Sequence, residues 1–105
     1  MHVLLVEVPD CPHAAGAAAR LTEALDLVGR GDVRVDRVVV SSAAEAGRLG
    51  APGSPTILVN GRDLFPSKDS AAGGALACRL YRTPAGLAGV PTVDQLVDAL
   101  SAWEA

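Results

Sequence analysis

Aromatic residues are scarce in this chain of 105 residues, and Phe65, Tyr81 and Trp103 make up only 3% of it. Half of the sequence is hydrophobic, so a core has to be built from Val, Leu and Ala. Nine basic and twelve acidic residues give a formal charge of -3, and no basic stripe alternates with aromatics. We therefore expect no nucleic acid partner, because surfaces that bind nucleic acids are usually basic.

Cysteine is also rare, with Cys11 and Cys78 alone. Two thiols are too few for a four-cysteine iron-sulfur cluster or a disulfide scaffold, and the chain hardly has the ligands for a closed zinc site. The N-terminus lacks a basic region and Glu7 interrupts its apolar run, so we expect no signal peptide and no membrane interaction. The sequence predicts a cytoplasmic single domain over residues 1–105 without cofactor or metal, since no long linker divides it.

The first part of the chain has the pattern of a β-α-β unit. Residues 2–8 are rich in Val and Leu, as in a buried strand. Residues 14–29 place apolar side chains at three- and four-residue steps, which predicts an amphipathic helix ending at Gly29. Residues 33–40 predict a second strand, parallel to the first because a helical crossover joins them.

The remaining elements also have local signals. Ser42 and Glu45 have capping-box spacing for a short helix to residue 49, and Thr92 with Gln95 has the same spacing for a terminal helix. Between them, Asn60-Gly61 separates residues 56–59 from 62–65, which predicts a β-hairpin. The fold class is therefore α/β, in the order β-α-β-α-β-β-α, with residues 66–90 as an insertion or irregular segment before the last helix.

Cys11 lies where the first strand ends and the first helix begins. Unpaired N–H groups and the helix dipole favour negative charge at a helix start, so we expect its thiol to ionise more easily than a free one. Pro12 fits the first helical turn because it donates no N–H. His13 could add positive charge beside the thiol, whereas Asp10 acts in the opposite sense; alternatively, His13 is a surface residue without a role.

The tetrapeptide Cys11-Pro12-His13-Ala14 resembles the active-site turn of the thioredoxin superfamily, with Ala14 where the second cysteine of the dithiol motif stands. The order of elements is similar to the thioredoxin fold, a four-stranded mixed sheet with helices on both faces. The layout also resembles small actinobacterial thioredoxin-like proteins, some of them labelled organomercurial-lyase-like. The resemblance covers most of the chain and fails in residues 66–90.

Ser54-Pro55-Thr56 resembles the segment of that superfamily in which a cis-proline faces the catalytic cysteine. The resemblance implies that Pro55 is cis and that the backbone of Ser54 and Thr56 faces the substrate. Together with Pro12 and His13, these residues are the predicted substrate-binding set. The implied partner is a protein or small-molecule thiol or disulfide.

A monothiol motif needs a second thiol to resolve its product. Cys78 could supply it, if its Cα comes within roughly 7 Å of that of Cys11; alternatively, Cys78 is an inert core residue, as buried cysteines often are. Arg79 and Arg82 could hold a thiolate or an anionic ligand, or could be solvated ends of an element. Arg62 and Lys68 could likewise meet a substrate carboxylate.

Three functions follow from these residues. The first is a thiol-disulfide oxidoreductase with Cys11 as nucleophile and Cys78 as possible resolving thiol. The second is a binding module that keeps the fold without catalysis, because fold alone does not establish activity. The third is soft-metal or organomercurial binding by Cys11 and Cys78, with or without His13, since thiolates suit soft cations.

Overall fold

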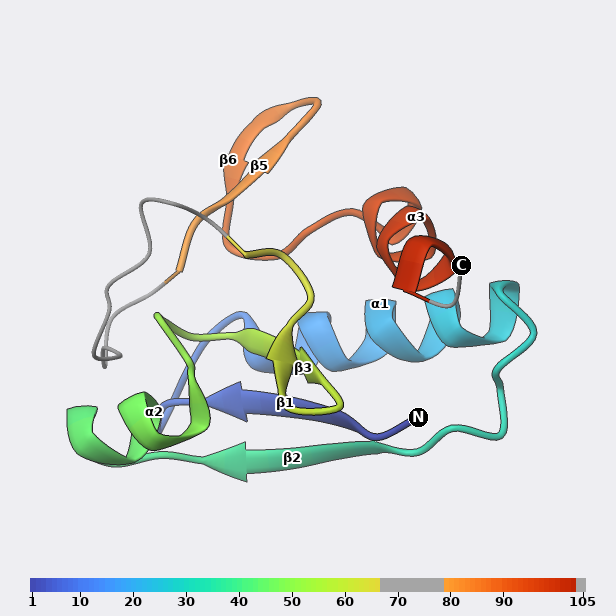
Figure 1. Ribbon diagram of the computed structural model, residues 1–105. Helices are drawn as coiled ribbons and strands as arrows, with labels where there is room; N and C mark the ends of the chain where they lie inside the picture. Colours follow the sequence, from blue (N-terminus) through green and yellow to red (C-terminus); the bar gives the residue numbers. More distant parts are fainter. Residues whose placement is uncertain (67–78, 104–105) are drawn as a thin grey trace.

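The computed structural model describes residues 1–66 and 79–103 and shows an α/β fold around a four-stranded mixed sheet (Figure 1). The strands lie in the order β2-β1-β3-β4, so β1 (Val3–Glu7) is central. A 14-residue helix, α1 (Ala14–Leu27), connects β1 to β2 (Val35–Val39), and the two strands pair in parallel from Val3↔Val35 to Glu7↔Val39. The predicted β-α-β unit is confirmed.

The predicted hairpin is also confirmed. β3 (Thr56–Val59) pairs antiparallel with β1, and β4 (Arg62–Asp63) pairs antiparallel with β3. Asn60 and Gly61 have φ of 52° and 82°, as a type I′ turn requires. β4 is shorter than the expected residues 62–65: after it the Leu64 N–H still donates to the Ile57 carbonyl at 2.9 Å, and the Phe65 N–H then donates to the Asp63 carboxylate at 2.9 Å, a local turn contact.

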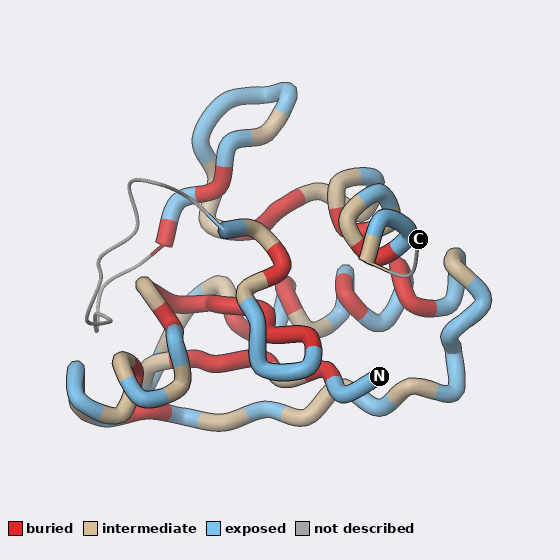
Figure 2. The backbone as a smooth tube through the Cα atoms, in the orientation of Figure 1, coloured by how far each residue is buried: buried red, intermediate tan, exposed pale blue. Residues whose placement is uncertain are grey.

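Helices cover both faces of the sheet, as predicted. On one face, α1 and α3 (Val93–Trp103) pack on Val3, Leu5 and Ile57. On the other face, α2 (Ala43–Leu49) contributes Ala46 to a smaller cluster around Val6 and Leu58. The buried residues coincide with the central strands and the inner sides of the helices (Figure 2). Both capping interactions form, with Glu45 N–H donating to Ser42 Oγ at 3.1 Å and Gln95 N–H to Thr92 Oγ1 at 3.1 Å.

Residues 81–88 form a second, two-stranded sheet that sequence analysis did not predict. β5 (Tyr81–Thr83) and β6 (Gly86–Ala88) pair antiparallel, and the hairpin projects from the rest of the molecule (Figure 1). Its turn places Gly86 at φ 114°, a conformation that favours glycine. The expected irregular segment therefore contains regular structure next to the start of α3.

Other expected boundaries are also wrong, including the end of α1, which lies at Leu27 and not at Gly29. Pro12 does not lie in the first helical turn, because α1 begins at Ala14 with His13 as its N-cap; the N–H of Ala14 instead donates to the Cys11 carbonyl at 3.4 Å, closing a turn ahead of the helix. The second strand is shorter than residues 33–40, and its apolar end is not fully buried, with Val39 50% exposed. β2 is an edge strand, so its Val39 has neighbours on one side only.

Candidate functional site

Cys11 occupies the connection between the central strand and α1. The chain leaves β1 in a tight turn in which the N–H of Cys11 donates to the Val8 carbonyl at 3.3 Å. Pro9 and Asp10 are its middle residues, and Asp10 has φ 58°; proline followed by a residue of positive φ is typical of a type II turn. Cys11 is half-buried, and its thiol is free. This turn presents one unpaired, partly accessible thiol just before the N-terminus of α1.

The structure brings the Cys11 turn and the Ser54-Pro55 loop together. The N–H of Val8, the residue that opens the turn, donates to Ser54 Oγ at 3.0 Å. The Ser54-Pro55 peptide bond is cis, as the resemblance implied. Ser54, Pro55 and Thr56 are buried, and Thr56 Oγ1 donates to the Gly53 carbonyl at 2.5 Å. Two segments more than forty residues apart in the sequence thus meet at the end of β1.

Arg79 and Tyr81 hold the Ser54-Pro55 loop from the other side. The N–H of Arg79 donates to the Ser54 carbonyl at 2.8 Å, its Nη1 reaches Thr56 Oγ1 at 3.4 Å, and the Tyr81 hydroxyl donates to the Pro55 carbonyl at 2.5 Å. We call this arrangement the Arg79 clasp. It engages the backbone or side chain of each residue in the predicted substrate-facing segment. The Arg79 side chain is 8% exposed, so the alternative that Arg79 is a solvated end residue is wrong.

The Arg79 guanidinium is the centre of a buried polar network. Nη1 donates to Asp63 Oδ2 at 2.8 Å, Nη2 donates to the Phe65 carbonyl, and Cζ lies 4.7 Å from the centroid of the Tyr81 ring. The Phe65 and Tyr81 rings meet edge to face at 5.6 Å. The Arg79 and Asp63 side chains are 8% and 15% exposed. Because neither charge is well solvated, removing one of the two side chains would leave the other as an uncompensated buried charge and destabilise the fold.

Tyr81 gives a pH prediction. Burial raises the pKa of its phenol above the ordinary value, partly offset by the Arg79 charge. Because the folded state holds this proton more tightly, the stability from Tyr81 is fully present below about pH 10 and is lost as the pH rises further. Tyr81 is the single tyrosine, so tyrosinate absorbance reports it alone. We expect it to ionise only together with alkaline unfolding; ionisation near pH 10 with an intact circular dichroism spectrum would contradict its burial.

His13 lies against Gly89, in the connection between β6 and α3. A Cβ built on Gly89 would stand 2.6 Å from both Cγ and Nε2 of His13 and closer still to Cδ2. The ring is half-buried and makes no capping hydrogen bond to α1. His13 is thus half-buried, with its imidazole close to backbone from a distant part of the chain, and its action on Cys11 stays a prediction.

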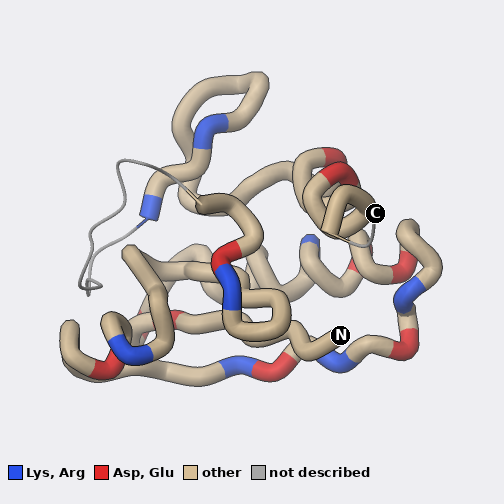
Figure 3. The backbone as a smooth tube through the Cα atoms, viewed as in Figure 1, with Lys and Arg blue, Asp and Glu red and all other residues tan. Residues whose placement is uncertain are grey.

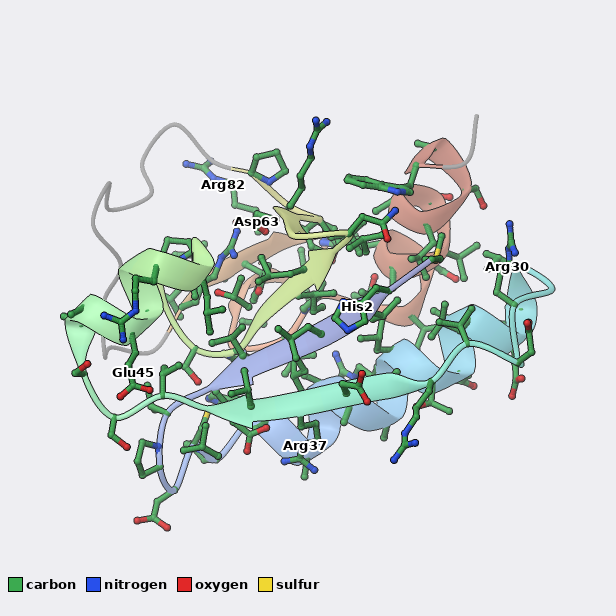
Figure 4. All side chains as sticks on the ribbon, turned by 60° about the horizontal axis from the view of Figure 1, so that its bottom comes forward. His2, Arg30, Arg37, Glu45, Asp63 and Arg82 are labelled. Atoms are coloured by element: carbon green, nitrogen blue, oxygen red, sulfur yellow. The ribbon has the colours of Figure 1, made fainter. Side chains whose placement is uncertain are left out.

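Glu7 was not among the residues predicted for the site. Glu7 follows Val3 and Leu5 on the sheet face under α1 and α3, at the end of β1 that leads to Cys11. Its carboxylate accepts from Arg37 Nε at 2.8 Å and from Nη2 at 3.0 Å, and its side chain is 12% exposed. Arg37 extends from β2 (Figure 4). Its hydrogen bonds to Glu7 and the negative charge of Glu7 raise the pKa of the Arg37 guanidinium. The sequence signal that could have indicated this buried ion pair is the acidic residue at position 7, inside an otherwise apolar strand.

The described arginines that were predicted to meet an anionic ligand or a substrate carboxylate do not gather in one place. Arg62 and Arg82 are exposed, on β4 and β5. Figure 3 shows basic and acidic residues interspersed along the described chain. Opposite charges also pair, since Arg34 Nε, just before β2, lies 3.5 Å from Asp36 Oδ1 on that strand. Cys78 and Lys68 lie outside the described residues, so the predicted contact of Cys78 with Cys11 stays a prediction.

Within residues 1–66 and 79–103, no helix has the length and apolar character needed to cross a membrane. The same part of the chain contains no group of three His, Cys, Asp or Glu side chains that could hold a metal ion.

Comparison of the chain with protein-family models, with curated proteins and with solved structures finds no match. The fold and the geometry of the Cys11 turn are therefore what any functional proposal has to rest on.

Proposed function

We propose that the protein is a thiol-disulfide oxidoreductase with Cys11 as its nucleophile. The observation that carries the proposal is the free, half-buried Cys11 thiol in the turn between β1 and α1, tied to the Ser54-Pro55 loop through Val8. A reactive cysteine needs partial access and a surrounding that favours the thiolate. The turn provides the access, and the start of α1 presents unpaired N–H groups close in sequence.

The reaction is an exchange of sulfur-sulfur bonds. The Cys11 thiolate attacks one sulfur of a substrate disulfide, and the other substrate sulfur leaves as a thiolate while Cys11 forms a mixed disulfide. A second thiolate can then attack the Cys11 sulfur; the substrate sulfur leaves as a thiolate, and Cys11 ends in a disulfide with the second thiol, which a further thiol of the glutathione class reduces. Alternatively, the second thiolate attacks the substrate sulfur, and Cys11 leaves as a thiolate. In the second case the incoming thiol ends in a disulfide with the substrate; no other electrons are needed.

Ala14 is buried at the start of α1 and carries no thiol, so the second thiol comes from elsewhere. We propose either a small thiol of the glutathione class or Cys78. Cys78 immediately precedes Arg79 in the sequence, and Arg79 is anchored to the Ser54 carbonyl beside the Cys11 turn. That anchor supports Cys78 as a resolving thiol. Pro12, His13, Ser54, Pro55 and Thr56 would then border the substrate.

Turnover of a fluorogenic mixed disulfide of glutathione, with excess reduced glutathione as reductant, tests the proposal. We expect Cys11→Ser to abolish turnover, because a hydroxyl does not form the mixed disulfide. Cys78→Ser is the matched control: it keeps turnover if a small thiol resolves the intermediate, and accumulates glutathionylated Cys11 if Cys78 does. Turnover by Cys11→Ser at the parent rate would disprove the role of Cys11.

The alternative proposal is a binding module without catalysis. It is favoured by the burial of Ser54, Pro55 and Thr56 and by their engagement in the Arg79 clasp. In that case the parent protein shows no turnover above the uncatalysed exchange, although Cys11 is still available to alkylating reagents. Binding of a soft metal by the two thiols predicts instead a stoichiometric Hg²⁺ complex that is lost in either cysteine variant.

A further inference from the structure

We infer that Gly89 is a positioning residue for the Cys11 site. Because Gly89 has no side chain, the imidazole of His13, two residues after Cys11 in the sequence, can lie directly against its backbone. We call this contact surface at Gly89 the seat of His13. This inference rests on the proposed function, since it assigns a role relative to the Cys11 thiol. It is carried by the packing of residues 89–92 on α1.

The seat admits only glycine while the ring stays in place. A separation of 2.6 Å or less between a Cβ at position 89 and three ring atoms is far shorter than any real carbon contact. Gly16 provides the contrast, because a Cβ added there would meet no atom within 4 Å. An alanine at 89 therefore forces the His13 ring out of its observed position, whereas an alanine at 16 displaces nothing.

The segment that carries Gly89 is fixed on both sides. Val90 is buried in the core formed by α1 and α3, and the carbonyl of Pro91 accepts from Arg20 Nη1 at 3.0 Å. His13, the N-cap of α1, and Arg20 on the helix are seven residues apart, or about two helical turns, so they stand on the same side of α1. Residues 89–92 are thus held at two points on this side, with His13 against Gly89 and Arg20 at Pro91.

The far end of the segment is fixed as well. The N–H of Thr92 donates to Gln95 Oε1 at 2.9 Å, and Gln95 Nε2 donates to the Arg82 carbonyl at 2.6 Å. These bonds join the start of α3 to β5. The seat therefore belongs to the folded frame of the molecule, and it can keep the imidazole in one place instead of following its movements.

The consequence for chemistry is that the His13 ring has a set position next to the thiol turn. A seated imidazole acts on the Cys11 thiolate from a constant geometry, whereas an exposed one would sample several rotamers. His13→Ala, which removes the ring, and Gly89→Ala, which displaces it, should then have the same effect on the reactivity of the Cys11 thiol. The two changes should not add, because each removes the same interaction.

A double-mutant cycle of Cys11 alkylation rates at neutral pH tests this, using iodoacetamide with peptide-level mass spectrometry. We expect Gly89→Ala and His13→Ala each to slow the reaction about twofold or more, the lower end of coupling between residues in contact. Gly89→Ala should slow it no further in the His13→Ala background. Gly16→Ala is the matched control and should leave the rate unchanged. Additive effects of Gly89→Ala and His13→Ala, or no effect of Gly89→Ala, would overturn the inference.

NMR gives a readout that does not depend on Cys11 chemistry. The His13 ring should shift the Gly89 Hα resonances, and the shift should disappear in His13→Ala. If the parent shows this shift but no disulfide turnover, the proposed function fails and the seat stands. If turnover is present and the Gly89 resonances are the same with and without His13, the seat is wrong. Where Gly89→Ala lowers the melting temperature, the His13→Ala/Gly89→Ala variant should regain it.

Discussion

Replacing Arg79 with alanine is expected to lower the free energy of unfolding by about 3–5 kcal/mol. The substitution leaves Asp63, with a side chain 15% exposed, without its charge partner. It also removes the donors to Thr56 and to the Phe65 carbonyl and the contact with the Tyr81 ring. Because a small domain is stable by only about 5–15 kcal/mol, this loss should be plain in urea unfolding followed by circular dichroism.

Arg82→Ala is the matched control for Arg79→Ala. Arg82 lies three residues further on, is exposed on β5 (Figure 4), and gives its backbone carbonyl, which alanine retains, to Gln95. We expect its effect to stay within about 0.5 kcal/mol. In addition, Asp63→Ala combined with Arg79→Ala should cost less than the sum of the single changes. Equal stability of Arg79→Ala and Arg82→Ala would contradict the Arg79 clasp.

Leu25→Ala is expected to cost about 2–5 kcal/mol, because it removes a side chain that α1 buries in the main core. Leu25 is 1% exposed and packs in the cluster that contains Ile57 and Leu96, both 0% exposed. The burial of Leu25 agrees with the amphipathic helix predicted for residues 14–29. Chemical unfolding of Leu25→Ala measures the effect.

The same helix offers the control. Leu27 stands two residues after Leu25 on α1 and is 64% exposed. Leu27→Ala makes the same chemical change at a similar helical position, so we expect its free energy of unfolding to stay within about 0.5 kcal/mol of the parent. If the two variants unfold at the same urea concentration, the assignment of the buried face of α1 is wrong.

Local signals were enough to predict most of the main sheet and its helices. The change from a valine-rich run to a three- and four-residue period around Cys11 predicts the junction of β1 and α1, and Asn60-Gly61 predicts the hairpin. These patterns depend on neighbours in the sequence, so they can be interpreted without the fold. The cis peptide bond before Pro55 is different in kind: it followed from a family resemblance and not from composition.

The contacts that shape the site were not predictable in this way. Arg79 and Asp63 are sixteen residues apart, and only the return of the chain after residue 78 brings them together. The β5–β6 hairpin contains no long β-branched run, and its turn at residues 84–86 was a weak signal. The contact of His13 with Gly89 depends on the position of residues 89–92 on α1, which no pattern at residue 13 contains.

Alkylation of both thiols in one digest, before and after mild oxidation with a glutathione disulfide, is the most direct test of Cys11 as the nucleophile. We expect Cys11 to be alkylated faster than free glutathione at the same pH. After oxidation, Cys11 should be found as a glutathione adduct or in a peptide cross-linked to Cys78. Alkylation no faster than that of glutathione, with Cys11 still a free thiol after oxidation, would rule out Cys11 as the nucleophile and favour a binding module on this fold.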